Sequence, residues 1–344
     1  MVLLQKLYRI VNNNISKNMK ERIEWIDLAK GFSIILVVYG HSGLSAVPFL
    51  GDWFAAFRMP FFFIVSGLLF SISKYPTFIS FLKRRWLTLV RPYFIFSLTL
   101  MLGIWILHPD SIAFIIKDIV IKGWGGYALW FIPILFFTEI VYFFICKYID
   151  IKSLRFLFLL CSAIIGYITY KLDFYNNYNI CFVFTSVLFY GIGNLLSDWM
   201  KNLFRNLNMS ILIQYTFALF LCSLFFLLNH QKPEFFINKL SGIYTYIAAF
   251  SGAFFMCSVS SIVSRLHYQP IRIMKEGIKY MGRNSYIILA FHQIILQLLG
   301  LTCLFSGSIQ RLIMWFSLIM LIEGINRYFP FVLGKKKMLP LLLE

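Results

Sequence analysis

Long apolar runs of about 20 residues recur along the chain and are separated by short polar connections. A run of this length is what a helix needs to cross a bilayer, and lipid offers the backbone no partner outside the helix. No alternating ten-residue pattern of a β-barrel is present. The pattern therefore predicts an all-α integral membrane protein, a bundle of about ten transmembrane helices at 27–46, 53–73, 92–107, 128–146, 154–170, 180–197, 210–229, 241–263, 285–303 and 309–329.

Basic residues are distributed unequally between the two sides of the membrane. An even number of spans places both termini on the same side. The side of the termini carries 25 of the 32 lysines and arginines, whereas the opposite side carries six. Because Lys and Arg are enriched in cytoplasmic loops, this bias predicts that both termini are cytoplasmic. The net charge of +18 is then a topology signal, and no nucleic-acid partner is expected beside the lipid bilayer. We expect one membrane domain at 25–330, between a cytoplasmic segment at 1–24 and a cytoplasmic tail at 331–344.

The composition excludes an ordinary soluble protein, with 60% hydrophobic and only 13% charged residues. The sequence has no P-loop, dinucleotide fingerprint, zinc-ligand spacing or hydrolase nucleophile elbow. We therefore expect neither a bound cofactor nor a metal. Ionisable residues inside the apolar runs are the more informative signal, because the bilayer makes each of them costly. They are His41, Arg58, Glu139, His292 and Glu323, with Asp27 and Lys30 at the edge of the first run.

Lys30 and His41 are eleven residues apart, which places them on one face of a helix and about 16 Å apart along its axis. If the second span folds back beside the first, Arg58 lies at the depth of His41. A neighbouring cation favours the unprotonated, basic form of an imidazole. His41 is therefore a candidate general base for a hydroxyl group. The alternative is that His41 only forms a hydrogen bond between helices.

A second candidate group is basic and lies after the second span. Arg84, Thr88 and Arg91 follow an i, i+4, i+7 spacing, so an α-helix would stack them on one side, where two arginines can hold phosphates. The alternative is an interfacial helix with ordinary cytoplasmic charge. Glu139 and Glu323 fit paired structural groups, and His292 fits either a cavity or a bond between helices.

These residues lie in motifs that resemble those of the acyltransferase 3 membrane proteins, in particular the fucose 4-O-acetylase-like branch. The opening RIEWIDLAKG, followed by VVYGH, looks like the family's first signature, and FRMPFFF with a later SG looks like its second. Later segments are similar in the same order: Arg84-Arg85 with Arg91-Pro92-Tyr93, Leu129-Trp130-Phe131, and Gly282, Ser285 and His292.

The resemblance implies an enzyme that moves an acyl group, usually acetyl, from cytoplasmic acyl-CoA to a sugar hydroxyl. The acceptor would be a surface polysaccharide or its lipid-linked precursor. His41 would be catalytic, and Arg84, Arg85 and Arg91 would bind the donor together with Lys30. Arg58 stands where many members have histidine. Larger relatives carry a glutamate at the position that Leu135 occupies in this chain, and Glu139 lies four residues later.

The two lines of reasoning lead to one expected mechanism in a bacterial cell membrane. Acetyl-CoA is a co-substrate, His41 deprotonates the sugar hydroxyl, and Arg58 stabilises the oxyanion at the thioester carbonyl. Asp27, Trp130, Glu139, His292 and Glu323 are possible supporting residues. Two other classes stay open: a transporter or flippase of lipid-linked sugars, and a glycan polymerase. The sequence names neither the acceptor sugar nor the oligomeric state.

Overall fold

The computed structural model describes residues 23–42, 48–107, 116–117, 125–172, 180–229, 243–301 and 307–335. These residues form helices and no strands. In chain order the elements are α2 (Glu24–His41), α3 (Pro48–Leu68), η1 (Ile72–Lys74), α4 (Phe78–Arg85), η2 (Trp86–Val90), α5 (Arg91–Leu107), η4 (Tyr127–Trp130), α7 (Phe131–Tyr148), α8 (Lys152–Lys171), α9 (Ile180–Leu195), α10 (Ser197–Asn206), α11 (Met209–Asn229), α12 (Ile243–Arg265), α13 (Gln269–Arg283), α14 (Ser285–Leu301), α15 (Gly307–Tyr328) and η6 (Pro330–Leu333).

The predicted class of an all-helical membrane protein is confirmed for the described residues. Each of the ten predicted ranges overlaps one long helix. Within the part of the chain that the structure describes, five helical stretches are long and apolar enough to cross a membrane: Phe78–Trp105, Tyr127–Tyr148, Lys152–Thr169, Tyr244–Arg265 and Gly307–Tyr328. Shorter apolar helices span Phe182–Leu195, Met209–Phe225 and Ser285–Gly300. The number of ten spans and the cytoplasmic termini stay predictions. Residues 1–22 and 336–344, which make up most of the predicted end segments, lie outside the described residues.

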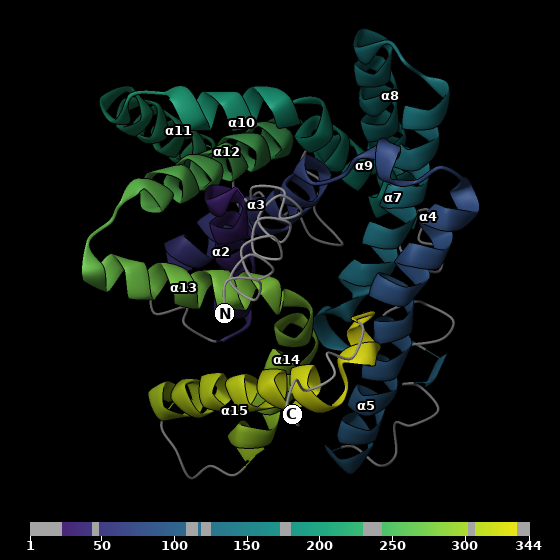
Figure 1. The fold of residues 1–344 in the computed structure, drawn as a ribbon, viewed down its shortest axis with the longest axis vertical. Helices are drawn as coiled ribbons and strands as arrows, with labels where there is room; N and C mark the ends of the chain where they lie inside the picture. The colour runs from purple at the N-terminus through teal and green to yellow at the C-terminus, as the bar shows by residue number, and fades with distance from the viewer. Residues whose placement is uncertain are drawn as a thin grey trace, which may run out of the picture.

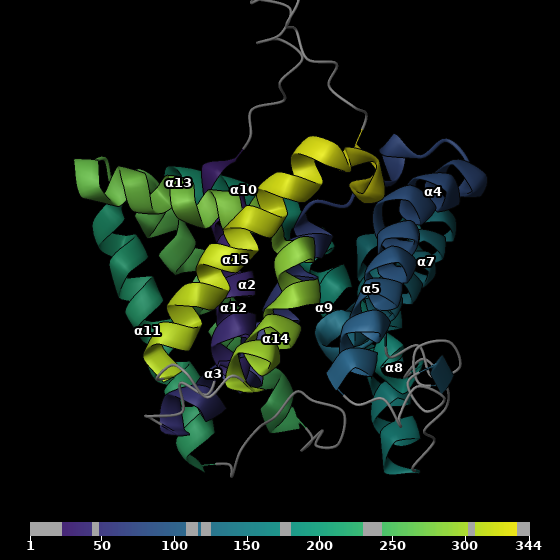
Figure 2. The same cartoon turned by 90° about the horizontal axis from the view of Figure 1, so that it is seen from below.

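Helices α2 and α3 lie at the centre of one group of helices (Figure 1). Helix α2 packs against α3, α12, α13 and α14, and α3 also packs against α9. Helix α9 in turn contacts α7 and α8, and thereby joins the second group, which contains α4 and α5 (Figure 1). The amphipathic α13 lies across one end of the bundle, the end at which α10 and α4 are also found (Figure 2).

Glycine allows a close helix crossing between α2 and α13. A Cβ added to Gly31 would overlap the backbone carbonyl of Ile278, and one added to Gly282 would lie 2.7 Å from the Gly31 nitrogen. Only hydrogen at these positions lets the two backbones touch. The crossing fixes α2 against α13 directly beside Lys30.

The chain after α3 departs from the regular α-helix assumed for its basic residues. Trp86–Val90 forms a π-helical turn, in which hydrogen bonds run to the fifth residue rather than the fourth. Element η6 packs on this turn, where a Cβ on Gly334 would lie 2.8 Å from the Leu87 carbonyl oxygen. The extra residue in the turn shifts Arg91 out of the straight i, i+7 register with Arg84.

Candidate active site

His41 and Arg58 meet where α2 ends. His41 is the last residue of α2, and Arg58 lies near the middle of α3, which folds back beside it. The guanidinium of Arg58 rests against Gly40, so closely that a Cβ there would overlap its Nη1 atom. Both side chains are partly buried. A permanent positive charge therefore lies beside the His41 imidazole, close enough to interact with it electrostatically.

A second histidine faces His41 from α14. His292 is completely buried, and its Nε2 atom lies 3.4 Å from His41 Nδ1. The two rings meet edge to face with centroids 5.2 Å apart. Arg311 of α15 approaches from the same end and donates a 3.5 Å hydrogen bond to the Ser42 carbonyl. Arg58 of α3 and His292 of α14 thus flank His41, and Arg311 of α15 bonds the backbone of the residue that follows it.

The hydrogen-bond partner of His41 defines which ring nitrogen is available for chemistry. Its Nδ1 lies 2.8 Å from the backbone carbonyl of Val37, which can only accept a hydrogen bond. Nδ1 therefore carries the proton, and Nε2 carries the lone pair. A basic nitrogen beside a fixed cation can take a proton from a hydroxyl while the cation stabilises negative charge that develops nearby.

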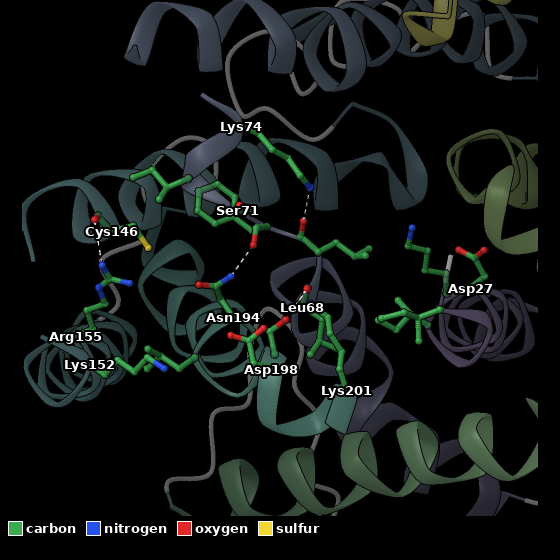
Figure 3. Close-up of a pocket in the computed structure, with 18 of the residues that line it drawn as sticks. Asp27, Leu68, Ser71, Lys74, Cys146, Lys152, Arg155, Asn194, Asp198 and Lys201 are labelled. Atoms are coloured by element: carbon green, nitrogen blue, oxygen red, sulfur yellow. Dashed lines mark hydrogen bonds between the residues drawn. The ribbon is translucent and has the colours of Figure 1, made fainter. Parts of the chain in front are cut away.

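Lys30 lies at the other end of α2, in the wall of a cavity of about 860 Å³. Figure 3 shows this cavity, with Lys74, Lys152 and Lys201 pointing into it from different elements. Asp27 and Asp198 are the acidic residues of its lining. Seven basic side chains oppose these two acids: Lys30, Lys74, Lys152, Arg155, Lys201, Arg283 and Lys335. The excess positive charge suits a ligand with several negative charges.

The floor of the cavity is a set of capped helix ends. Asn194 donates hydrogen bonds to the carbonyl of Gly67 (3.1 Å), in the last turn of α3, and to the carbonyl of Phe70 (2.8 Å), just after α3. Ser197 donates a 3.0 Å bond to the Leu68 carbonyl. Arg155 caps α7 through a 3.3 Å bond to the Cys146 carbonyl. These bonds hold the wall rigid, because they satisfy carbonyls that a helix terminus leaves without partners.

Arg85 and Glu139, two predicted site residues, form a buried ion pair between α4 and α7. Arg85 Nε lies 2.7 Å from Glu139 Oε2, and the side chains are only 19% and 5% exposed. Tyr190 donates a 3.2 Å hydrogen bond to the other carboxylate oxygen. The guanidinium also lies 5.7 Å from the centroid of the Phe81 ring. Arg85 is thus held by the protein itself, and it is not among the described residues that line the cavity.

The remaining predicted residues are not among the described residues that line this cavity. Arg84 is exposed on α4, and Arg91 donates a hydrogen bond to the Phe331 carbonyl of η6. Glu323 is exposed on α15 and accepts a hydrogen bond from the Tyr280 hydroxyl. Trp130 is buried in η4. The structure therefore brings together His41, Arg58 and His292 at one end of α2, and Asp27 and Lys30 at the other.

The family model of the acyltransferase domain, acyltransferase 3, matches residues 23–322. The chain belongs to the acyltransferase 3 family. The match contains both ends of α2 and every side chain of the His41 group, so these are parts of a membrane acyltransferase. No curated protein and no solved structure gave a significant match to the chain. The fucose 4-O-acetylase-like branch stays a prediction.

The cavity of this acyltransferase contains basic residues that the sequence analysis treated only as topology signals. Lys201 lies on α10 and Arg283 at the end of α13, two short amphipathic helices between the long apolar ones. Lys152 and Arg155 lie in the first turn of α8. In α10 and α13, polar and apolar residues alternate with the period of a helix, and this pattern predicts an amphipathic helix. The convergence of these basic residues on one cavity depends on tertiary packing.

Proposed function

We propose that this membrane acyltransferase is an O-acetyltransferase that moves an acetyl group from cytoplasmic acetyl-CoA to a sugar hydroxyl. The acceptor is a surface polysaccharide or its lipid-linked precursor in a bacterial cell membrane. The observation that carries this proposal is the placement of two different environments at the ends of one helix. Helix α2 has Lys30 in the wall of a strongly basic cavity and His41 beside Arg58, about 16 Å away.

The basic cavity supports acyl-CoA as the donor. Coenzyme A carries three phosphoryl groups on a nucleotide, and seven basic side chains against two acidic ones provide the complementary charge. The volume of about 860 Å³ is within the range of pockets that hold organic ligands of this kind. Lys30 and Lys201 contribute from α2 and α10. We assign the nucleotide to this cavity, whose described lining includes neither Arg84 nor Arg91.

The flexible pantetheine arm of the donor then extends along α2 from Lys30 towards His41. At that end, His41 Nε2 takes the proton of the acceptor hydroxyl while the oxygen attacks the thioester carbonyl carbon. Arg58 stabilises the oxyanion of the tetrahedral intermediate. When the intermediate collapses, the carbon–sulfur bond breaks, and His41 returns its proton to the thiolate. The products are an O-acetyl sugar and free coenzyme A, and His41 is neutral again.

The first test concerns the product of the reaction. Surface polysaccharide is isolated from cells with and without the gene and from a strain that carries His41→Ala, and its O-acetyl groups are measured by proton NMR. We expect the acetyl signals to vanish in the deletion and the His41→Ala strain while the polysaccharide keeps its length. Loss or shortening of the polysaccharide would instead favour the transporter or the polymerase. Normal acetylation in the His41→Ala strain would exclude its role as the base.

The second test concerns the donor site. Lys201→Ala and Arg283→Ala should each raise the apparent KM for acetyl-CoA by about 10-fold, because each removes one charge-assisted contact to phosphate. Lys171→Ala is the matched control, since it removes the same charge from an exposed position at the far end of α8. With acetyl-dephospho-CoA, which lacks one phosphate, the KM of each variant should differ less from the KM of the unchanged enzyme. Equal KM values in all three variants would exclude this cavity as the nucleotide site.

A further inference from the structure

The two histidines at the end of α2 differ in what they can do. His41 is partly exposed and presents its Nε2 lone pair, whereas His292 is completely buried on α14. We propose that His292 is a positioning residue for the acyl transfer: it accepts a hydrogen bond from His41 Nδ1–H and thereby holds His41 in the tautomer whose Nε2 is the base. The proposal rests on the proposed role of His41 as general base.

The donors and acceptors around the pair permit one neutral arrangement. His292 Nδ1 lies 2.8 Å from the Ile288 carbonyl, so it must donate, just as His41 Nδ1 must donate to the Val37 carbonyl at 2.8 Å. A protonated His292 Nε2 would point its hydrogen at the hydrogen on His41 Nδ1. His292 is therefore neutral, and its Nε2 lone pair faces His41 Nδ1 at 3.4 Å.

The His41 Nδ1–H group thus has two acceptors that share it. The Val37 carbonyl belongs to the same helix as His41 and lies 2.8 Å from Nδ1. His292 belongs to another helix and fixes the ring from the side, with ring planes inclined by 60°. This is the arrangement by which enzymes orient a basic imidazole: one nitrogen bonded to a fixed acceptor, the other free to react.

The charged groups that face His41 show why a neutral acceptor is needed. Arg58, a permanent cation, approaches the ring from α3, and Arg311 of α15 bonds the carbonyl of the neighbouring Ser42. When His41 takes a proton from the acceptor hydroxyl, it becomes a second positive charge beside Arg58. Its Nδ1–H then becomes a stronger donor, and the lone pair of His292 stabilises it. The contact of 3.4 Å is expected to shorten at that step.

The test compares His292→Leu, which removes the acceptor, with His292→Gln, whose Oε1 can accept at the position of Nε2. The exposed His267 of the α12–α13 connection gives the matched control, His267→Leu. Purified full-length protein transfers radiolabelled acetyl from acetyl-CoA to polysaccharide from the gene-deleted strain, and kcat and KM are measured from pH 5 to 9.

We expect His292→Leu to lower kcat by about 10- to 100-fold with an unchanged KM for acetyl-CoA, as the loss of a group that orients a functional imidazole does elsewhere. The acid limb of its pH–rate profile should move to lower pH, because protonated His41 has lost an acceptor. His292→Gln should keep most of kcat and the original profile. An unchanged kcat in His292→Leu, or an equal fall in both variants with unmoved profiles, would overturn the proposal.

A measurement without catalysis separates this proposal from the proposed function. Nitrogen-15 spectra of histidine-labelled protein in lipid report which nitrogen of each ring carries hydrogen, and the His41→Gln variant assigns the His41 signals. We expect a protonated Nδ1 and an unprotonated Nε2 for His41. A protonated Nε2 would overturn the role of His292 even if the enzyme is active or if His292→Leu fails to fold. Absence of acetyl transfer by the unchanged protein would overturn the proposed function alone.

Discussion

The guanidinium of Arg58 packs against the backbone of Gly40, the residue that precedes His41. A Cβ at residue 40 would occupy the space of the guanidinium, so Arg58 would have to move. The contact sets the distance between a permanent cation and the candidate base from two different helices, α2 and α3. A side chain at residue 40 is therefore a way to move Arg58 without altering His41.

We predict that Gly40→Ala lowers kcat by about 100-fold or more, close to the effect of Arg58→Gln. The new methyl group meets only the flexible end of Arg58, so the helices can stay in place while the guanidinium moves away from the oxyanion. Gly51→Ala is the control, because it lies near the start of α3 and a Cβ there meets nothing within 4 Å. Acetyl transfer by Gly40→Ala at the unchanged rate would show that Arg58 needs no fixed position.

The Arg85–Glu139 pair gives a prediction about stability rather than donor binding. Glu139→Gln leaves a mostly buried guanidinium without its counter-charge and should destabilise the protein by about 3 to 5 kcal/mol. The double variant Arg85→Met/Glu139→Gln should recover much of this loss, because no charge stays buried. Thermal unfolding in detergent measures both effects.

The same double variant distinguishes the structural role of Arg85 from the donor-binding role that the resemblance implied. We expect its KM for acetyl-CoA to stay within about twofold of the unchanged enzyme, which corresponds to less than about 0.5 kcal/mol. A KM that rises tenfold in the stable double variant would return Arg85 to the donor site.

The sequence predicts the helices, because their signal is local. It does not predict the contacts that depend on how these helices pack together. Apolar runs located the long helices, and the spacing of Lys30 and His41 placed both on α2. The π-helical turn at Trp86–Val90 packs against η6, which is far away in the sequence, and the local sequence pattern does not predict this contact. The pairing of His41 with His292 joins residues 251 positions apart, and only the packing of α14 on α2 brings them together.

Glu24 predicts a pH dependence at the end of the molecule that contains the basic cavity. It forms ion pairs with Lys279 at 3.1 Å and Lys275 at 3.3 Å and thereby ties the start of α2 to α13. Burial alone would raise the pKa of Glu24, but the two ammonium groups outweigh burial and hold the pKa below its usual value. The stabilisation is therefore present above the pKa of an unfolded glutamate, about 4.3, and is lost as the pH falls through the lower folded value.

We expect the unchanged protein to be more thermostable than Glu24→Gln at pH 7 and to lose this advantage below about pH 4. The difference should be about 1 kcal/mol or less, because the Glu24 side chain is 37% exposed and solvent screens the pairs. Melting curves of both proteins between pH 3.5 and 7 check this. A constant difference over that range would show that Glu24 acts by packing and not by its charge.

The glycine crossing of α2 and α13 gives the last prediction, because it connects stability with the donor site. A Cβ on Gly31 meets the Ile278 backbone, which cannot move aside as a side chain can. Gly31→Ala should therefore force the two helices apart and destabilise the protein by about 1 to 3 kcal/mol. It should also raise the KM for acetyl-CoA, since α2 carries Lys30 and α13 ends at Arg283.

Gly277→Ala is the matched control on α13, where a Cβ meets nothing within 4 Å. It should leave KM unchanged and stabilise the helix by about 0.5 to 1 kcal/mol, because alanine loses less backbone entropy than glycine. The two variants make the same chemical change and differ in the neighbouring backbone that the new methyl group meets. If Gly31→Ala and Gly277→Ala had the same melting temperature and the same KM, the close crossing would not position Lys30 for the donor.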